Sequence, residues 1–241
     1  MHGSPGFTFL IYIAAGITSM VLFAGATTGD GIAAQLASIG RHATDLRLTI
    51  LLNLVMNLCA LVLAVTLYAI TRQQDRELAL LAGTCRVAEG IAGMDVSGTL
   101  GLLWLATGTG GTALDAGAGS ALGAFLLKTQ QTMGASATLF AVGSTIFSWL
   151  LLRGRMIPAP LAWLGVVASI LLVACCPLVL AGLLRGQVTS LMWLPMLLFE
   201  VVLALWLIVR GTGVEGSAAV DTAAGGRAVK PHPSDIATVA S

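Results

Sequence analysis

Three ionisable side chains lie within long apolar stretches of the sequence. Arg86 and Glu89 stand three residues apart in LALLAGTCRVAEGIAGM, and Glu200 stands in LPMLLFEVVLALW. An arginine and a glutamate at this spacing lie on one side of a helix. An unpaired charge at the centre of a bilayer costs at least about 2.5–3.5 kcal/mol. We therefore expect the three side chains to meet in the folded protein.

One guanidinium can neutralise only one of two carboxylates. The other carboxyl group, held out of water beside a like charge, is expected to keep a proton near neutral pH. Such a buried acid can protonate a lipophilic substrate or bind the polar head group of a ligand. We predict Glu200 as the proton donor, Glu89 as its partner and Arg86 as the charge that sets their protonation. The alternative is a purely structural pair that fixes two helices in register.

A second group of polar residues is expected nearer the outer surface. Asn53 and Asn57 share a helix face at the i,i+4 spacing, and counting from the ends of the apolar segments places Asp95 at the same depth. We predict these three residues, together with Phe199, as substrate-binding. For the asparagines, hydrogen bonding between helices is the alternative.

The composition indicates the solvent in which these groups must be placed. Of the 241 residues, 57% are hydrophobic and only 10% are charged, and the mean hydropathy is +0.94. A soluble domain carries about 25% charged residues. Long apolar runs favour helices over membrane β-strands, because a helix satisfies its own backbone hydrogen bonds. We predict an all-α, polytopic transmembrane bundle of six helices.

Each of six apolar segments reaches the roughly 20 residues that a helix needs to cross about 30 Å of hydrocarbon. The third segment is expected to be one continuous helix, on which Gly93, Ser97 and Gly101 line the side that carries Arg86 and Glu89. Small residues at every fourth position allow close helix contact, so this side should face the bundle. The predicted spans are Phe7–Ala26, Leu48–Thr71, Leu78–Leu105, Met133–Leu152, Ala159–Leu184 and Leu191–Val209.

The segments outside the spans have simpler interpretations. Residues 1–6 are predicted as a short N-terminal tail, 7–210 as the transmembrane domain and 211–241 as a disordered C-terminal tail. Ile32–His42 is expected to lie along the outer surface as a short amphipathic helix. The glycine-rich segment Thr107–Ser120 is expected to be an outer loop.

The distribution of charge indicates orientation and excludes some partners. The formal net charge is +1, and no basic stripe points to nucleic acid. With the N-terminus inside, seven Lys and Arg fall on inner connections and four on outer ones, which favours two cytoplasmic termini in a bacterial inner membrane. The four cysteines lack the spacing of a metal or redox site, so we predict no metal and no cofactor.

Three stretches of the chain resemble a bacterial membrane family known as domain of unknown function 4386. They are Leu78–Gly90 (LALLAGTCRVAEG), Phe147–Gly165 (FSWLLLRGRMIPAPLAWLG) and Pro195–Gly211 (PMLLFEVVLALWLIVRG). The resemblance covers most of residues 7–211. It implies six transmembrane helices and matches Arg86, Glu89 and Glu200 to polar positions that the family places inside the membrane. The chain departs from the family at Lys128-Thr-Gln-Gln, where the resemblance implies an acidic residue and a histidine.

Three functions are compatible with a buried Arg/Glu/Glu site. The first is binding or conversion of a membrane lipid or another lipophilic small molecule. By size and by its intramembrane acids, the chain is loosely similar to integral-membrane terpene cyclases, which start isoprenoid cyclisation with an acid, although no motif carries this likeness. The second is a small proton-coupled transporter, which a homo-oligomer would make easier to build. The third is a non-catalytic membrane scaffold.

Overall fold

The computed structural model describes residues 5–108, 115–131 and 135–210. Every regular element within these residues is a helix, which confirms the predicted all-α class. The predicted C-terminal tail, residues 211–241, lies outside the described residues. The helices are α1 (Pro5–Ala26), α2 (Ile32–Arg41), α3 (Ala43–Thr71), α4 (Arg76–Gly93), α5 (Ser97–Thr107), α6 (Ala116–Gln131), α7 (Ala135–Arg153), α8 (Ala159–Leu180), α9 (Val188–Leu191) and α10 (Leu194–Arg210).

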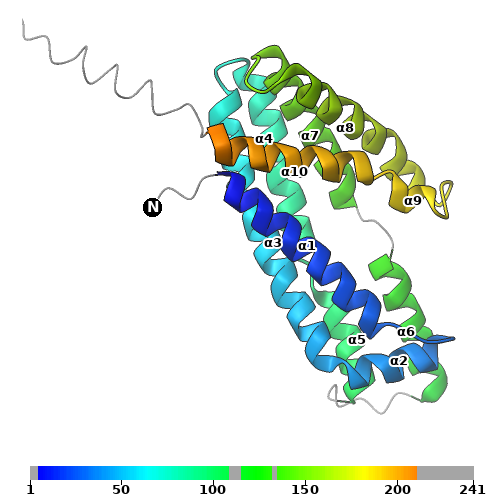
Figure 1. Ribbon diagram of the computed structural model, residues 1–241. Coiled ribbons are helices and arrows are strands. Elements are labelled where there is room, and N and C mark those ends of the chain that lie inside the picture. Colours follow the sequence, from blue (N-terminus) through cyan, green and yellow to red (C-terminus); the bar gives the residue numbers. More distant parts are fainter. Residues whose placement is uncertain (1–4, 109–114, 132–134, 211–241) are drawn as a thin grey trace, which may run out of the picture.

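One group of helices, which we call the main bundle, consists of α1, α3, α4, α7, α8 and α10. Helices α2, α5 and α6 gather at one end of it (Figure 1). Within the main bundle α1 packs on α3 and α10, while α7 packs between α4 and α8. Its core includes Phe9, Leu63 and Phe140. A separate apolar cluster that includes Ile39 and Leu102 joins the three shorter helices to the ends of α1 and α3. The candidate site lies in the core of the main bundle.

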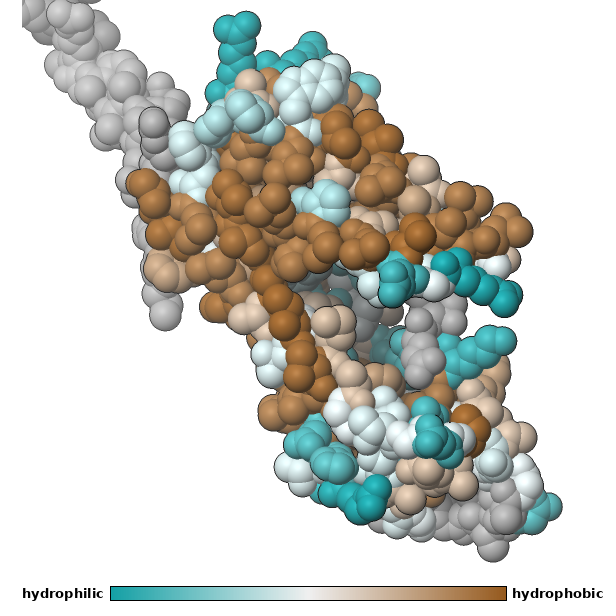
Figure 2. Space-filling view, turned by 45° about the vertical axis from the view of Figure 1, so that its right-hand side comes forward, coloured by the Kyte–Doolittle hydropathy of each residue, from teal (hydrophilic) through white to brown (hydrophobic). Residues whose placement is uncertain are grey.

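The surface of the main bundle is suited to lipid. Apolar side chains cover the face shown over α1, α8 and α10 (Figure 2), and Met20 and Val209 are 66% and 81% exposed. Large apolar areas of this kind on a helical bundle are typical of membrane proteins. Five stretches that include described residues are long and apolar enough to cross a membrane: Pro5–Ala26, Ala43–Thr71, Gly117–Arg153, Ala159–Leu180 and Val188–Val209.

The predicted third span, Leu78–Leu105, is divided into two helices. α4 ends at Gly93 and α5 begins at Ser97. α4 is 18 residues long and contains two arginines and two glutamates, so it is not one of the five apolar stretches. Nevertheless it packs between α3 and α7 in the main bundle. The structure therefore supports five candidate spans and does not confirm the predicted count of six.

The break in this segment also corrects the prediction of one continuous small-residue face. Gly93, at the end of α4, lies against Asn57 of α3, whereas Gly101 of α5 lies against Leu126 of α6. The two glycines therefore contact different neighbours. Close approach occurs at both positions, but it joins α4 to the main bundle and α5 to the shorter helices.

Most of the other predicted spans differ by only a few residues, but α6 (Ala116–Gln131) forms where no span was predicted and includes the end of the predicted outer loop Thr107–Ser120. α3 begins at Ala43 rather than Leu48, and α8 ends at Leu180 rather than Leu184. The turn after α8 contains Gly182 with a positive φ of 74°, a conformation that favours glycine and ends a helix. α2 forms where a short amphipathic helix was predicted.

The first and last spans meet at one end of the bundle. A Cβ added at Gly6 would lie 2.5 Å from the Ala204 carbonyl oxygen and 2.5 Å from Cγ1 of Ile208. The start of α1 and the end of α10 are therefore in direct contact, which places them on the same side of the bundle (Figure 1). That this side is cytoplasmic stays a prediction.

Candidate functional site

Arg86 and Glu89 form an ion pair on the buried side of α4. Arg86 Nη1 lies 3.0 Å from Glu89 Oε2, and the two residues are 2% and 8% exposed. The i,i+3 spacing brings the side chains together because they stand about one turn apart. α4 begins at a defined residue, since the Asp75 carboxylate accepts a hydrogen bond of 3.1 Å from the Leu78 N–H.

Two aromatic rings and a glycine surround the Arg86 side chain. Its Cζ lies 4.6 Å from the centroid of the Phe140 ring and 5.9 Å from that of Tyr12. Aromatic faces attract a cation through the ring quadrupole. Gly143 of α7 faces the aliphatic part of the side chain, and a Cβ added there would lie 3.0 Å from Arg86 Cγ. Arg86 is therefore held by α1 and α7 as well as by its own helix.

Two nitrogen atoms of Arg86 are buried without a hydrogen-bond partner among the described residues. They are Nε and Nη1, the second of which contacts Glu89 as an ion pair outside hydrogen-bond geometry. Buried N–H groups are nearly always hydrogen-bonded, because an unpaired one loses its water without compensation. Arg86 therefore has N–H groups that could donate hydrogen bonds to a bound water or ligand.

Glu200 of α10 faces the same cavity as Arg86 and is 7% exposed. The cavity offers about 20 Å³ to the centre of a water molecule, and no side chain that lines it is more than 8% exposed. Among the described residues Glu200 has no cation within ion-pair distance. The structure thus brings the three predicted residues to one buried site, in which Arg86 contacts Glu89 and shares a cavity with Glu200.

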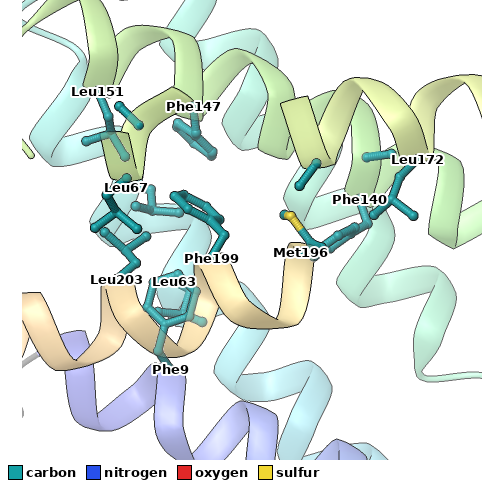
Figure 3. Close-up of a cluster of buried hydrophobic side chains, with 14 of the residues drawn as sticks. Phe9, Leu63, Leu67, Phe140, Phe147, Leu151, Leu172, Met196, Phe199 and Leu203 are labelled. Carbon is teal, nitrogen blue, oxygen red and sulfur yellow. The ribbon is translucent and has the colours of Figure 1, made fainter. Parts of the chain in front are cut away.

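Phe199 also lines this cavity and is 4% exposed. Its ring packs against Gly165 of α8, where an added Cβ would lie 2.5 Å from the ring. Phe147 of α7 extends toward Phe199 of α10, and Phe9 reaches the same cluster from α1 (Figure 3). The cavity therefore has aromatic and aliphatic walls around its few polar groups.

The predicted asparagines contribute to helix packing outside the cavity. Asn57 Nδ2 donates hydrogen bonds to the Gly93 carbonyl at 2.8 Å and to the Asn53 carbonyl at 2.7 Å. Gly93 is the last residue of α4, so the amide binds a carbonyl that the end of a helix leaves unpaired. The packing alternative accounts for Asn57, and substrate binding by either asparagine stays a prediction.

Asp95 lies in the break between α4 and α5 and is exposed. Its carboxylate accepts a hydrogen bond of 2.9 Å from the Ser97 backbone N–H. The Ser97 side chain and this N–H both favour the charged form and lower the pKa of Asp95. A carboxylate that accepts from the amide two residues ahead forms a local turn before α5, whose first capping position is Val96. Asp95 does not line the cavity, and its role in substrate binding stays a prediction.

Two serines that line the cavity were not among the site residues predicted from the sequence. Ser144 and Ser148 are buried and line it from α7. They stand four residues apart in an apolar helix, and this i,i+4 pair of small polar residues is the signal that could have found them. No group of three or more His, Cys, Asp or Glu that could hold a metal occurs in the part of the chain that the structure describes.

Comparison with known proteins gives a family without an assigned activity. The family model described as "Domain of unknown function (DUF4386)" matches residues 5–211, so the chain belongs to this family. No curated protein and no solved structure shows a significant match. Function must therefore be argued from the site.

Proposed function

We propose that this member of the DUF4386 family is a small proton-coupled membrane carrier, in which Glu200, Glu89 and Arg86 bind and release the proton. The observation that supports this proposal most strongly is the buried cavity shared by Arg86 and Glu200, which has room for about one water molecule. A site of this size suits a proton and its immediate hydrogen-bond partners.

The balance of charges supports a bound proton. The titratable side chains that act on Glu200 are Arg86 and Glu89 of α4 and Tyr12 of α1. Arg86 pairs with Glu89, and an ionised Glu200 would then be a buried charge without a partner of its own. Such a charge is costly, so the group takes up a proton instead. We assign the exchangeable proton to Glu200, coupled to Glu89 through Arg86.

The break after α4 supports a carrier. Helices interrupted near buried ionisable residues occur in secondary transporters. α4 ends at Gly93, one turn beyond Glu89, and the end is tied to α3 by Asn57. A movement at this break would shift Glu89 relative to Glu200 of α10. If binding of a solute caused this movement, it would change the affinity of Glu200 for its proton and so couple the two.

Conversion of a lipophilic substrate is the second candidate. The aromatic rings of Phe9, Phe147 and Phe199 on the cavity wall favour it, because such rings can stabilise a cation during isoprenoid cyclisation. However, sites for small molecules are typically about 300–1,000 Å³ in volume. An isoprenoid would therefore require the helices around Glu200 to separate.

Proton binding can be tested with purified protein before any solute is known. Proton uptake and release would be measured by titration of wild type and Glu200→Gln. Glu77→Gln is the control, because Glu77 is an exposed glutamate of α4, the helix that carries Arg86 and Glu89. We expect Glu200→Gln alone to lose one proton that wild type exchanges near neutral pH. Equal titration of wild type and a folded Glu200→Gln variant would contradict the proposal.

Coupling can be tested in proteoliposomes that contain a pH-sensitive dye. We expect the small-molecule fraction of a cell extract to produce proton flux with wild type and Glu77→Gln, but none with Glu200→Gln. If no extract or pH gradient produces flux, and an isoprenoid or acyl lipid copurifies with the protein, the lipophilic-substrate candidate replaces the carrier. Changed stability with neither result would leave the structural pair as the explanation.

A further inference from the structure

We infer that the cavity binds one internal water molecule, which connects the Arg86 guanidinium to the Glu200 carboxyl group and is positioned by Ser144 and Ser148. The water would hydrogen-bond Glu200 whether or not the carboxyl group holds its proton, and would so link the charge of Glu200 to the Arg86–Glu89 pair without any proton passing to the guanidinium. This link to proton binding rests on the proposed function, whereas the presence of the water follows from the cavity and from the unpaired donors.

The donors come from Arg86. Its Nε and Nη1 are buried and have no hydrogen-bond partner among the described residues. Buried polar atoms in this position are commonly satisfied by ordered water. Since Arg86 lines the cavity, a water placed there can accept a hydrogen bond from the guanidinium.

The size and lining of the cavity fit a single water. About 10–15 Å³ of space for the centre of a water molecule is enough for one water, and this cavity provides about 20 Å³. A buried water also needs two to four polar partners. Arg86, Glu200, Ser144 and Ser148 are the polar side chains that line the cavity. They comprise a donor, an acceptor and two hydroxyl groups that can serve as either.

The charges of the site favour water over a small anion. Two carboxyl groups and one guanidinium meet here, so an added anion would face at least as much negative as positive charge. A neutral water instead accepts from Arg86 and donates to an ionised Glu200. When Glu200 is protonated, the water accepts from it instead. The same molecule can therefore hydrogen-bond Glu200 in both protonation states without a movement of α10.

Substitution of Ser144 in α7 provides a selective way to remove this water. Ser144→Val places extra methyl groups in the cavity and removes one hydroxyl, so it should displace the water. Thr145→Val is the matched control on the same helix, since Thr145 donates to its own Ala141 carbonyl at 2.8 Å and does not line the cavity. Ser148→Ala adds no volume and should weaken the hydrogen bonding of the water without displacing it.

Infrared difference spectra between acidic and neutral pH, recorded in ordinary and ¹⁸O water, detect both partners. We expect an ¹⁸O-sensitive O–H band of a water, together with a carboxyl band that Glu200→Gln removes. The water band should persist in Thr145→Val, shift in Ser148→Ala and disappear in Ser144→Val.

Two results would overturn the inference in distinguishable ways. A Glu200 carboxyl band in wild type without an ¹⁸O-sensitive band would refute the water and leave the proton site standing. Absence of both bands would refute the proton site as well. An unchanged water band in folded Ser144→Val, judged by its circular dichroism, would place the water outside this cavity and refute the assignment.

Discussion

The replacement of Arg86 by methionine tests whether the guanidinium is the charge partner of Glu89. Arg86 is 2% exposed and its Nη1 lies 3.0 Å from Glu89 Oε2. Methionine keeps an unbranched apolar side chain beside Gly143 but removes the positive charge. Removal of one member of a buried pair typically costs about 3–5 kcal/mol, because the other charge stays buried.

The magnitude can be worked out from the proton that Glu89 would then need. An ordinary glutamate in the unfolded chain has a pKa of about 4.3, and each pH unit corresponds to about 1.4 kcal/mol. Keeping Glu89 neutral in the folded variant therefore costs about 3.7 kcal/mol at pH 7 and about 1 kcal/mol at pH 5. The folded variant binds one more proton than its unfolded chain, so its stability falls as the pH rises.

The assay is the free energy of unfolding in detergent micelles, measured by titration with a denaturing detergent at both pH values. Arg86→Met should lose about 4 kcal/mol at pH 7 and about 1–2 kcal/mol at pH 5, where the remaining loss includes the contact with Phe140. Arg76→Met is the control, since Arg76 is exposed at the start of α4. The double variant Arg86→Met/Glu89→Gln should lose most of the pH dependence. An equal loss at both pH values would refute the reasoning.

Further variants test the break between α4 and α5. Gly93→Ala should cost about 1–3 kcal/mol of unfolding free energy, because the added methyl group would collide with the Asn57 side chain. Gly25→Ala meets no atom within 4 Å and should leave stability equal or higher, so equal effects of the two would contradict this explanation. Asp95→Ala should cost about 1 kcal/mol at neutral pH, because it removes the hydrogen bond from the Ser97 N–H. Because hydrogen bonds from Ser97 lower the pKa of Asp95, this contribution is present above the ordinary aspartate pKa and is lost as the pH falls through the lowered value. A pH-independent effect in unfolding titrations would refute it.

Burial of the charged cluster could be predicted from the sequence because the physical requirement is strong. A lone charge is too costly in hydrocarbon, so Arg86, Glu89 and Glu200 had to face protein and one another. Counting residues along the spans was enough to place them at a common depth. The structure brings all three to the core of the main bundle, although the carboxyl of Glu200 reaches Arg86 across a cavity rather than by direct contact.

The local sequence gives only a weak signal for the division of the third span, the turn-forming pair Asp95 and Ser97. Met94, Asp95 and Val96 include neither proline nor glycine, and the apolar pattern continues on both sides. The break is stabilised by a hydrogen bond from Asn57 to Gly93, which are 36 residues apart in the chain. A partner so distant in sequence becomes visible only when α3 and α4 are packed together.

The position of the cluster along α4 has a consequence for the sidedness of the membrane. Glu89 is four residues from Gly93 and thirteen from Arg76, which correspond to about 6 Å and about 20 Å along the helix axis. Asp95 is exposed next to Gly93, and a carboxylate at this position would be costly in hydrocarbon, so we expect water at that end of α4. Access from the aqueous phase is therefore much shorter from one compartment than from the other. In sealed vesicles of a single orientation, acidification of the compartment that faces the α4–α5 break should reach the cluster first.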